Sequence, residues 1–322
     1  MRPMRKKTIF FALLMAFSAL IVVGCGSGKS LTLATGANSG TYYPIGKAMA
    51  EIINDAKVGV NVTAQSSSGS VSNINLLKNG QADLAIVQSD IAYYAMSGTQ
   101  MYQGNVVGNI QGLAELYPES CQFVVRRDSS LHSLEDVRGM RVAVGVEDSG
   151  SEINVRQILS VHGIDYDDIE PVYVYFAEGM LELQQGKVDV VCLTAGCPTP
   201  VVQNVAKQTD IRLLPVEHDK AKELMERFPF YAEVVIPPGT YNGLTEETNT
   251  VAVMAMLACS DKIDEKTGYD ISKALFTNLP KLKETHAVGE KISLENAQRG
   301  MVNGMSLTIN QGAEKFFAEQ KK

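Results

Sequence analysis

The sequence predicts an α/β protein of two lobes, each with a mostly parallel β-sheet. Short apolar runs of strand type alternate with segments whose apolar residues recur at helical spacing, which is the pattern of strands joined by helices. Turns rich in Gly, Ser and Thr separate the two kinds of segment. The same succession starts again after about residue 121, so we expect a second unit built like the first.

The first 24 residues have the order of an export signal. Four basic residues precede an uncharged apolar run over residues 8–23. The run ends in "VVGCGSGKS", where Gly24 before Cys25 and a polar spacer resemble the lipobox of bacterial lipoproteins. This resemblance implies a signal peptide over residues 1–24, lipidation of Cys25 and a flexible spacer over residues 25–30. A membrane-spanning anchor and an incidental cysteine are the alternatives.

The composition of the remaining chain excludes one class of partner. Without residues 1–24 the chain has 298 residues, of which 25 are basic and 36 acidic, a net charge of −11. No stretch has the basic clustering that a phosphate backbone requires, so we expect no nucleic-acid partner. The length suits two domains, and 45 % apolar residues supply buried cores.

Four cysteines follow Cys25, and their spacing is not that of a zinc site. They are Cys121, Cys192, Cys197 and Cys259. No histidine lies close enough in sequence to complete a tetrahedral set with Cys192 and Cys197. A disulfide between these two and buried free thiols are both open for an exported protein.

The first lobe begins with a strand, a turn and a helix. "LTLAT" at residues 31–35 is a β-type run, and "GTYYPIGKAMAEIIN" follows with Ile45, Met49, Ile52 and Ile53 at helical spacing. Residues 36–41 therefore form the turn, whose glycines permit close approach and whose helix leaves its first amides unpaired. Such amides can bind an anion or a polar ligand. An ordinary connection with nothing bound is equally compatible, whereas the spacing fits neither a P-loop nor a dinucleotide fingerprint.

Two further turns follow strands of the same predicted sheet. "VGVNVTAQ" leads into the turn at residues 66–70 and the helix after it, and "ADLAIV" leads into residues 88–90 and another helix. Ligands of parallel α/β sheets lie at the carboxyl ends of strands. Three polar turns on one rim therefore favour a binding site over three unrelated connections.

The second lobe repeats this arrangement. "CQFVVRR" is expected to cross between the lobes, and "RVAVGV" to open a new sheet before the turn at residues 149–151. "KVDVVCLTAGCPTPVVQNVAK" places residues 194–196 between a strand and a helix, with Pro198 or Pro200 near the helix start. Both lobes thus present amide-rich helix starts, and we expect a cleft between them that closes on a solute.

The combination of motifs resembles the TAXI family of solute receptors of TRAP transporters, the tripartite ATP-independent periplasmic systems. The resemblance runs from residue 31 to about residue 319. It rests on "TGANSGTYYPIGKAMAEIIN", "SSSGSVSNINLLKNGQADLAIVQSD", "RVAVGVEDSGSE", "MLACSDKIDEKTGYDISKALFTNL" and "ISLENAQRGM". The chain departs from the family near its end, where Asn310 and Gln311 of "INQGAEKFF" replace the usual His-Pro.

The resemblance implies a periplasmic-binding-protein-like, Venus-flytrap fold with hinge strands between the lobes. Lobe 1 would comprise residues 31–120 and 236–322, and lobe 2 residues 121–235. The ligand would be a small organic anion or amino acid, glutamate-like or a 2-oxoacid, delivered to TRAP membrane subunits. The protein would be a monomer without cofactor or metal, lipid-anchored on the outer side of the cytoplasmic membrane, in a periplasm or at the cell surface.

The site residues follow from the resemblance, turn by turn. Amides, hydroxyls and a tyrosine ring of the first turn would receive a carboxylate, Asp90 would accept from a ligand ammonium, and the second lobe would close over the solute. The alternatives are helix capping by each Ser, Thr or Asp and core packing by the tyrosines. The expected ligand-binding residues are Gly36, Ala37, Asn38, Ser39, Gly40, Thr41, Tyr42, Tyr43, Ser68, Gly69, Ser70, Gln88, Ser89, Asp90, Ser149, Gly150, Ser151, Thr194, Ala195 and Gly196.

None of these turns contains an arginine. We therefore expect neutral amides and hydroxyls to perform most of the anion recognition. Arg126 and Arg127, beside the expected hinge strand, either reach the cleft or form surface ion pairs.

Two other function classes are weighed against the receptor. An enzyme is disfavoured because none of the four histidines has a partner at ligand or triad spacing and no G-x-S-x-G elbow occurs. The acidic run at residues 165–170 lacks the glycine and terminal glutamate of a calcium loop. A sensor or surface lipoprotein that serves no transporter would have the same cleft and stays open.

Overall fold

The computed structural model describes residues 28–299 and 307–321 of the 322-residue chain. The predicted signal peptide, Cys25 and most of the predicted spacer lie outside the described residues. Within the described part, no helix combines the length and the apolar character needed to cross a bilayer.

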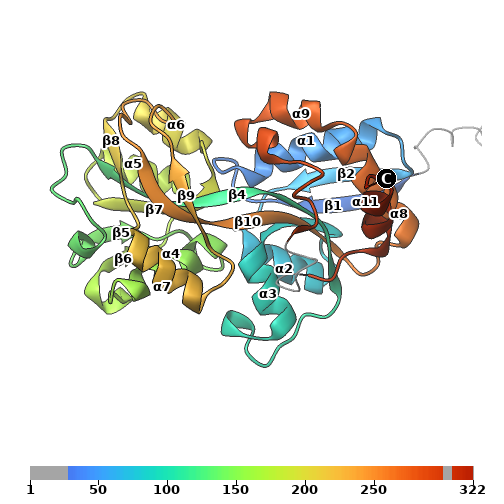
Figure 1. The fold of residues 1–322 in the computed structure, drawn as a ribbon, viewed down its shortest axis with the longest axis horizontal. Coiled ribbons are helices and arrows are strands. Elements are labelled where there is room, and N and C mark those ends of the chain that lie inside the picture. Colours follow the sequence, from blue (N-terminus) through green and yellow to red (C-terminus); the bar gives the residue numbers. More distant parts are fainter. Residues whose placement is uncertain (1–27, 300–306, 322) are drawn as a thin grey trace, which may run out of the picture.

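The N-terminal half of Figure 1 alternates strands and helices as predicted. Its elements are β1 (Lys29–Ala34), α1 (Tyr42–Asp55), β2 (Val60–Gln65), α2 (Ser70–Lys78), β3 (Leu84–Gln88), α3 (Ser89–Ser97) and η1 (Gln100–Tyr102). The helical spacing seen in the sequence is a buried face of α1, because Ile45, Met49, Ile52 and Ile53 are each at most 2 % exposed.

The long strand β4 (Ile110–Arg126) leads into the second half. There the chain forms η2 (Glu135–Val137), β5 (Arg141–Ala143), α4 (Gly150–Val161), η3 (Tyr166–Asp168), β6 (Glu170–Val172), α5 (Phe176–Gln184), β7 (Val190–Gly196), α6 (Pro200–Ala206), β8 (Ile211–Leu214), α7 (His218–Arg227) and β9 (Ala232–Ile236). Strand β10 (Thr248–Ser260) returns to the first half, where α8 (Glu265–Phe276), α9 (Leu279–Thr285), η4 (Ala287–Lys291) and α11 (Gln311–Glu319) follow.

The described strands form one mixed sheet in the order β2-β1-β3-β10-β4-β7-β5-β6, with β8 beside β4 and β9 beside β10. The outer pairs are parallel: β1 with β2 and β3, and β5 with β6 and β7. The central strands β10 and β4 are antiparallel to each other, with Ala252 opposite Ser120 and Cys259 opposite Gln111. Each half thus has its own parallel set, and the two sets are joined by the antiparallel centre.

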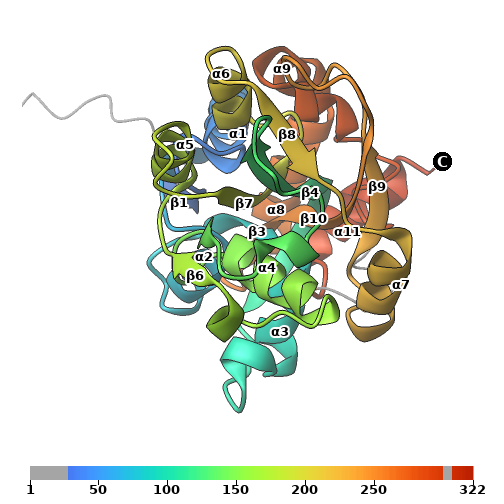
Figure 2. The same cartoon turned by 90° about the vertical axis from the view of Figure 1, so that its left-hand side faces the viewer.

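Strands β4 and β10 connect the two halves, as Figures 1 and 2 show. The 17 residues of β4 extend roughly 55 Å at about 3.3 Å per residue, long enough to belong to both. On β4, Leu113 and Tyr117 pack in the core of the first half, whereas Phe123 and Val125 pack in that of the second.

The packing of β10 suggests where the lobes divide. Val251 and Val253 pack with the second half and Ala255 with the first, while Ile236 and Tyr241 also pack in the second half. We therefore propose that lobe 2 extends to about residue 253, beyond the 235 expected from the sequence. The helices after β10 pack against α1, because Ile271 and Phe316 share a core with Ile45.

Candidate functional site

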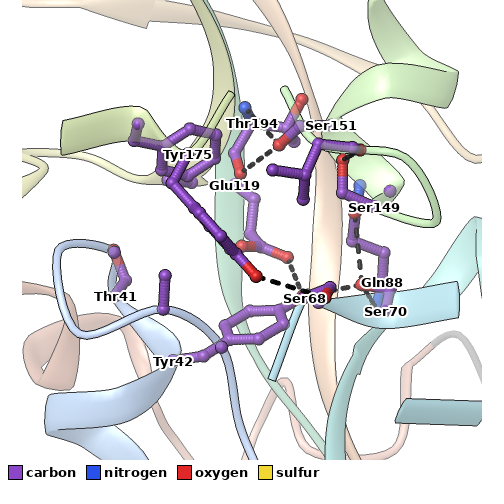
Figure 3. Close-up of a pocket in the computed structure, with 18 of the residues that line it drawn as sticks. Thr41, Tyr42, Ser68, Ser70, Gln88, Glu119, Ser149, Ser151, Tyr175 and Thr194 are labelled. Atoms are coloured by element: carbon purple, nitrogen blue, oxygen red, sulfur yellow. Dashed lines mark hydrogen bonds between the residues drawn. The ribbon is translucent and has the colours of Figure 1, made fainter. Parts of the chain in front are cut away.

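A pocket lies between the two halves, where strands end and helices begin (Figure 3). Its cavity has a volume of about 60 Å³. A water needs roughly 10–15 Å³ of such space, so the cavity has room for about four to six waters or one small solute.

The pocket brings together most of the residues predicted from the turns of both halves. Six of the predicted residues do not line it: Asn38, Ser39, Tyr43, Ser89, Asp90 and Gly196. Five other residues line it that the sequence analysis did not name: Glu119, Val146, Val174, Tyr175 and Phe176. The predicted residues that do line it are Gly36, Ala37, Gly40, Thr41, Tyr42, Ser68, Gly69, Ser70, Gln88, Ser149, Gly150, Ser151, Thr194 and Ala195.

The turn between β1 and α1 contributes the edge of the pocket nearest α1. Thr41 is the N-cap of α1, yet its side chain makes no capping hydrogen bond. Its hydroxyl donates instead to the main-chain oxygen of Gly196 in the second half, at 3.3 Å. The capping alternative therefore does not hold for Thr41, whose side chain joins the two lobes.

The turn before α2 is shaped by Gly69. This residue has φ 114°, a conformation that side chains rarely adopt, and the position of its missing Cβ is 3.7 Å from the Cβ of Ser149 across the pocket. The next residue, Ser70, accepts from the main-chain N–H of Gln88 at 3.1 Å and donates to its side-chain oxygen at 3.2 Å. The start of α2 and the end of β3 are thus tied together.

Of the described residues, Glu119 is the one with an acidic side chain that lines the pocket. It lies on the crossing strand β4, is 2 % exposed, and accepts a hydrogen bond from the hydroxyl of Tyr42 at 2.6 Å. Burial raises the pKa of its carboxyl to about 8, an effect that the bond from Tyr42 opposes and the charge of Asp90 increases. Burial, and next the charge of Glu119, raise the pKa of Tyr42 well above its ordinary value, so its hydroxyl stays a donor.

The second half contributes the turn before α4. Ser149 caps α4, because its hydroxyl accepts from the N–H of Glu152 at 3.2 Å, and it donates to the oxygen of Val146 at 2.7 Å. Ser151 and Thr194 are tied through the main chain of Thr194, whose N–H donates to the Ser151 hydroxyl at 3.0 Å. The capping alternative therefore holds for Ser149. The hydroxyls of Ser149 and Ser151 are both already hydrogen-bonded within the second half.

An aromatic and aliphatic wall completes the pocket on the side of α5. Val174, Tyr175 and Phe176 lie where β6 leads into that helix. The hydroxyl of Tyr175 is 3.4 Å from that of Ser68 in the first half, as Figure 3 shows, and its side chain is half exposed. This wall was not predicted from the sequence, although "VYVYF" before a helix is a usable signal.

The positive ends of three helices meet at the pocket. Helices α1, α2 and α4 begin at Tyr42, Ser70 and Gly150, all of which line it. The first amides of a helix have no partner within it and bear partial positive charge. Among the described residues, no Lys, Arg or His lines the pocket. Arg126 pairs with Asp128 and Arg127 donates to the oxygen of Gly243, so neither reaches it.

A buried hydrogen-bond network lies behind the pocket and joins the halves. The amide of Gln88 donates to Asn154 of α4 at 2.5 Å, and Asn154 donates to Asp90 at 2.8 Å and to Tyr231 at 2.7 Å. Burial raises the pKa of Asp90 to about 6, against the bond from Asn154. Asp90 thus faces the other lobe from behind the pocket.

Other chemistry-bearing groups lie away from the cavity. The four described cysteines are free, so no disulfide joins Cys192 and Cys197. Glu135, His162 and Glu217 place one ligand-type atom each within 4.8 Å of one another. His162 already hydrogen-bonds Glu217 at 3.1 Å, and it caps the end of α4 opposite to the pocket. The histidine spacing in the sequence did not reveal this cluster.

The profile of the NMT1-like family matches residues 33–320. The chain belongs to the NMT1-like family. This NMT1-like chain is also similar to solved structures at low identity. BugD, a periplasmic binding protein, has a TM-score of 0.58 at 12 % identity, over 91 % of this chain and 97 % of that one.

Two further structures have the same architecture. The periplasmic aliphatic sulphonate binding protein SsuA from Escherichia coli has a TM-score of 0.50 at 14 % identity, over 91 % of this chain and 84 % of that one. A putative L-cystine ABC transporter protein from Listeria monocytogenes has a TM-score of 0.51 at 15 % identity, over 84 % and 98 %. The predicted periplasmic-binding-protein-like fold is therefore confirmed, and the TAXI subtype stays a prediction.

Proposed function

We propose that this chain is an extracytoplasmic solute-binding receptor that captures a small amino acid or organic anion between its lobes. The observation that carries the proposal is the composition of the pocket, which is built from strand-to-helix turns of both halves. A solute in such a place contacts both lobes at once. Its binding energy therefore favours the arrangement in which they meet.

The contacts across the pocket support closure of the lobes on a solute. Thr41 bonds Gly196, and the N–H of Ser72 donates to the main-chain oxygen of Asp148 at 3.3 Å. These contacts lie around the cavity, so a bound solute and the closed arrangement stabilise each other. Closure would also create a composite outer surface that membrane subunits can distinguish from the open form.

The TAXI-type motifs of the sequence support delivery to a TRAP permease, and the lipobox-like segment supports anchoring through Cys25 outside the cytoplasmic membrane. Neither role involves a chemical reaction at the pocket, so we propose that the protein is not an enzyme. A chromosomal deletion of a neighbouring TRAP permease gene, if one is present, should abolish uptake of the solute that the receptor binds. Uptake that persists would favour the sensor or surface lipoprotein. Recovery of the bound solute in altered form would favour an enzyme.

A thermal-shift screen tests the receptor proposal. Residues 26–322 contain every described element, and a ligand at 100 times its dissociation constant should add about 2.7 kcal/mol to the free energy of unfolding. We expect at least one amino acid or organic acid to raise the melting temperature. Ser70→Ala should lower the affinity for that ligand about tenfold, because the substitution removes a hydroxyl that lines the pocket.

Ser72→Ala is the matched control, because Ser72 lies two residues further along α2, outside the pocket, and bonds Asp148 through its main chain only. A screen without any shift, or equal weakening by the two variants, would refute the proposal.

A further inference from the structure

The carboxyl group of Glu119 is a buried acidic group among the neutral side chains that line the pocket. Its Oε2 accepts a hydrogen bond from the hydroxyl of Tyr42, and among the described residues no second hydrogen bond to the carboxyl group occurs. The side chain is 98 % buried and lines the cavity, and Figure 3 shows it reaching from β4 into the middle of the pocket. A ligand in the cavity that donates to this carboxyl group would gain a charge-assisted hydrogen bond in a largely desolvated site.

The surroundings of Glu119 supply no positive charge. The titratable groups that face it are Tyr42 of α1, Tyr117 and Cys121 of β4 and Asp90 of α3, none of which can carry a positive charge. A ligand that places a carboxylate here would meet an acidic group. A ligand that places an ammonium here would form an ion pair within a desolvated site.

The opposite requirement holds at the helix starts. The first residues of α1, α2 and α4 line the same cavity, and the partial positive charge of these helix starts favours a negative group. Tyr42 links the two ends, because its main chain begins α1 while its hydroxyl bonds Glu119. About the length of one tyrosine side chain therefore separates the carboxyl from the first turn of the helix, a span suited to a small molecule with two charged ends.

We propose that the pocket selects a zwitterionic amino acid, with its ammonium group on Glu119 and a carboxylate on the amides at the starts of α1, α2 and α4. This inference rests on the proposed function as a solute receptor and narrows its ligand class. Organic acids of the same skeleton that lack the amino group bind more weakly. Glu119 determines this specificity, whereas the sequence led us to expect the ammonium contact at Asp90.

The protonation of Glu119 supplies an independent readout. With a pKa of about 8, the carboxyl is mostly protonated in the free protein at pH 7. An ammonium group on Oε1 favours the ionised form, so the proton leaves on binding. Binding of an amino acid at pH 7 is then expected to release protons, because the raised pKa leaves the carboxyl largely protonated before the ligand binds. An oxoacid accepts a hydrogen bond from the protonated carboxyl and releases none.

Matched ligand pairs test the proposal by isothermal titration calorimetry. The pairs are L-alanine with pyruvate, L-glutamate with 2-oxoglutarate, and 4-aminobutyrate with butyrate. They differ at the amino group and keep the carboxylates. We expect the amino member of at least one pair to bind at least tenfold more tightly than its partner. Titration in phosphate and in Tris, which differ in ionisation enthalpy, measures the proton released.

The variant Glu119→Gln keeps the shape of the side chain and cannot ionise. It should lose at least tenfold in affinity for the preferred amino acid, lose the proton release, and leave the oxoacid affinity within about twofold. Glu178→Gln on α5 is the control, because Glu178 is exposed and does not line the pocket, so the substitution removes a carboxylate outside it. Its affinities should equal those of the unchanged protein.

The outcomes separate this inference from the proposed function. Equal or tighter binding of the oxoacid members, or unchanged amino acid affinity in Glu119→Gln, overturns the inference and leaves a solute receptor. Failure of every pair, and of the wider thermal-shift screen, overturns the receptor itself. At pH 7 Glu119→Gln should unfold at a temperature no lower than the unchanged protein, because only the unchanged protein must keep, when folded, a proton that its unfolded chain has lost.

Discussion

Gly150 is the position where one methyl group should keep the lobes apart. It is the first residue of α4, and the Cβ of an alanine there would lie 1.5 Å from Oε1 and 2.5 Å from Cδ of Gln88 in the other lobe. Gln88 is not free to move aside, because its side chain donates to Asn154 and accepts from Ser70. Within its own lobe, Gly150 has no left-handed backbone that would disfavour alanine.

The size of the effect follows from these contacts. Overpacking costs about 1–3 kcal/mol and one lost buried hydrogen bond about 1 kcal/mol more, so Gly150→Ala should disfavour closure by about 2–4 kcal/mol. At about 1.4 kcal/mol per factor of ten, the dissociation constant of the solute rises roughly 30- to 900-fold. The stability of the lobes should be unchanged, because the clash exists only where they meet.

Two measurements check this prediction. Calorimetry gives the affinity for the ligand found by thermal shift, and small-angle scattering gives the radius of gyration with that ligand present. We expect Gly150→Ala to stay more extended than the unchanged protein at equal ligand concentration. Gly108→Ala is the control, because its Cβ would meet no atom within 4 Å. Unchanged affinity and an unchanged radius in Gly150→Ala would refute the idea that these lobes close directly on each other at Gln88.

Three further predictions concern stability. Since the pKa of Glu119 is raised from 4.5 to about 8, the folded protein keeps a proton that the unfolded chain has lost, and its stability should fall by about 1.4 kcal/mol per unit between pH 5 and pH 8. Urea unfolding at several pH values should show that the free energy of unfolding of Glu119→Gln lacks this part of the decline. Parallel pH profiles of the variant and the unchanged protein would contradict the prediction. Asn154→Ala leaves its buried partners without a hydrogen bond and should lower the free energy of unfolding by about 2–4 kcal/mol. The control is Asn242→Ala, which removes one half-buried hydrogen bond. An equal or smaller loss in Asn154→Ala than in this control would count against the network. Because the described cysteines are free, reductant should leave the melting temperature of residues 26–322 unchanged, and a drop would disprove it.

The turns of the site could be predicted because their signals are local. A glycine or serine between a β-type run and a helical period marks a strand end and a helix start wherever the rest of the chain goes. In a parallel sheet the carboxyl ends of strands share an edge, so the turns at Thr41, Ser70 and Ser151 could be placed together without coordinates.

Glu119 carried no such local signal. It lies inside an apolar stretch, "LAELYPESCQFVV", in which either face of the strand can be turned to the cavity. Its place depends on β10 and β7, which lie on the two sides of β4 and are opposite Glu119 at Val253 and Gly196. For Asp90 the local signal was correct and the expected contact was not seen. The helix start at Asp90 was predicted, yet its side chain accepts from Asn154 of α4 and does not line the pocket.

By itself the sequence determined the alternation of strands and helices, the polar turns between them and the repetition in two units, because these depend on backbone propensities and on periods within a few residues. Only the tertiary structure decided which oxygen faces the solute, which hydroxyls are already engaged and which side chains cross between lobes. Those contacts join residues far apart in the chain, such as Gln88 and Asn154, 66 positions apart, and they form only when the two halves pack.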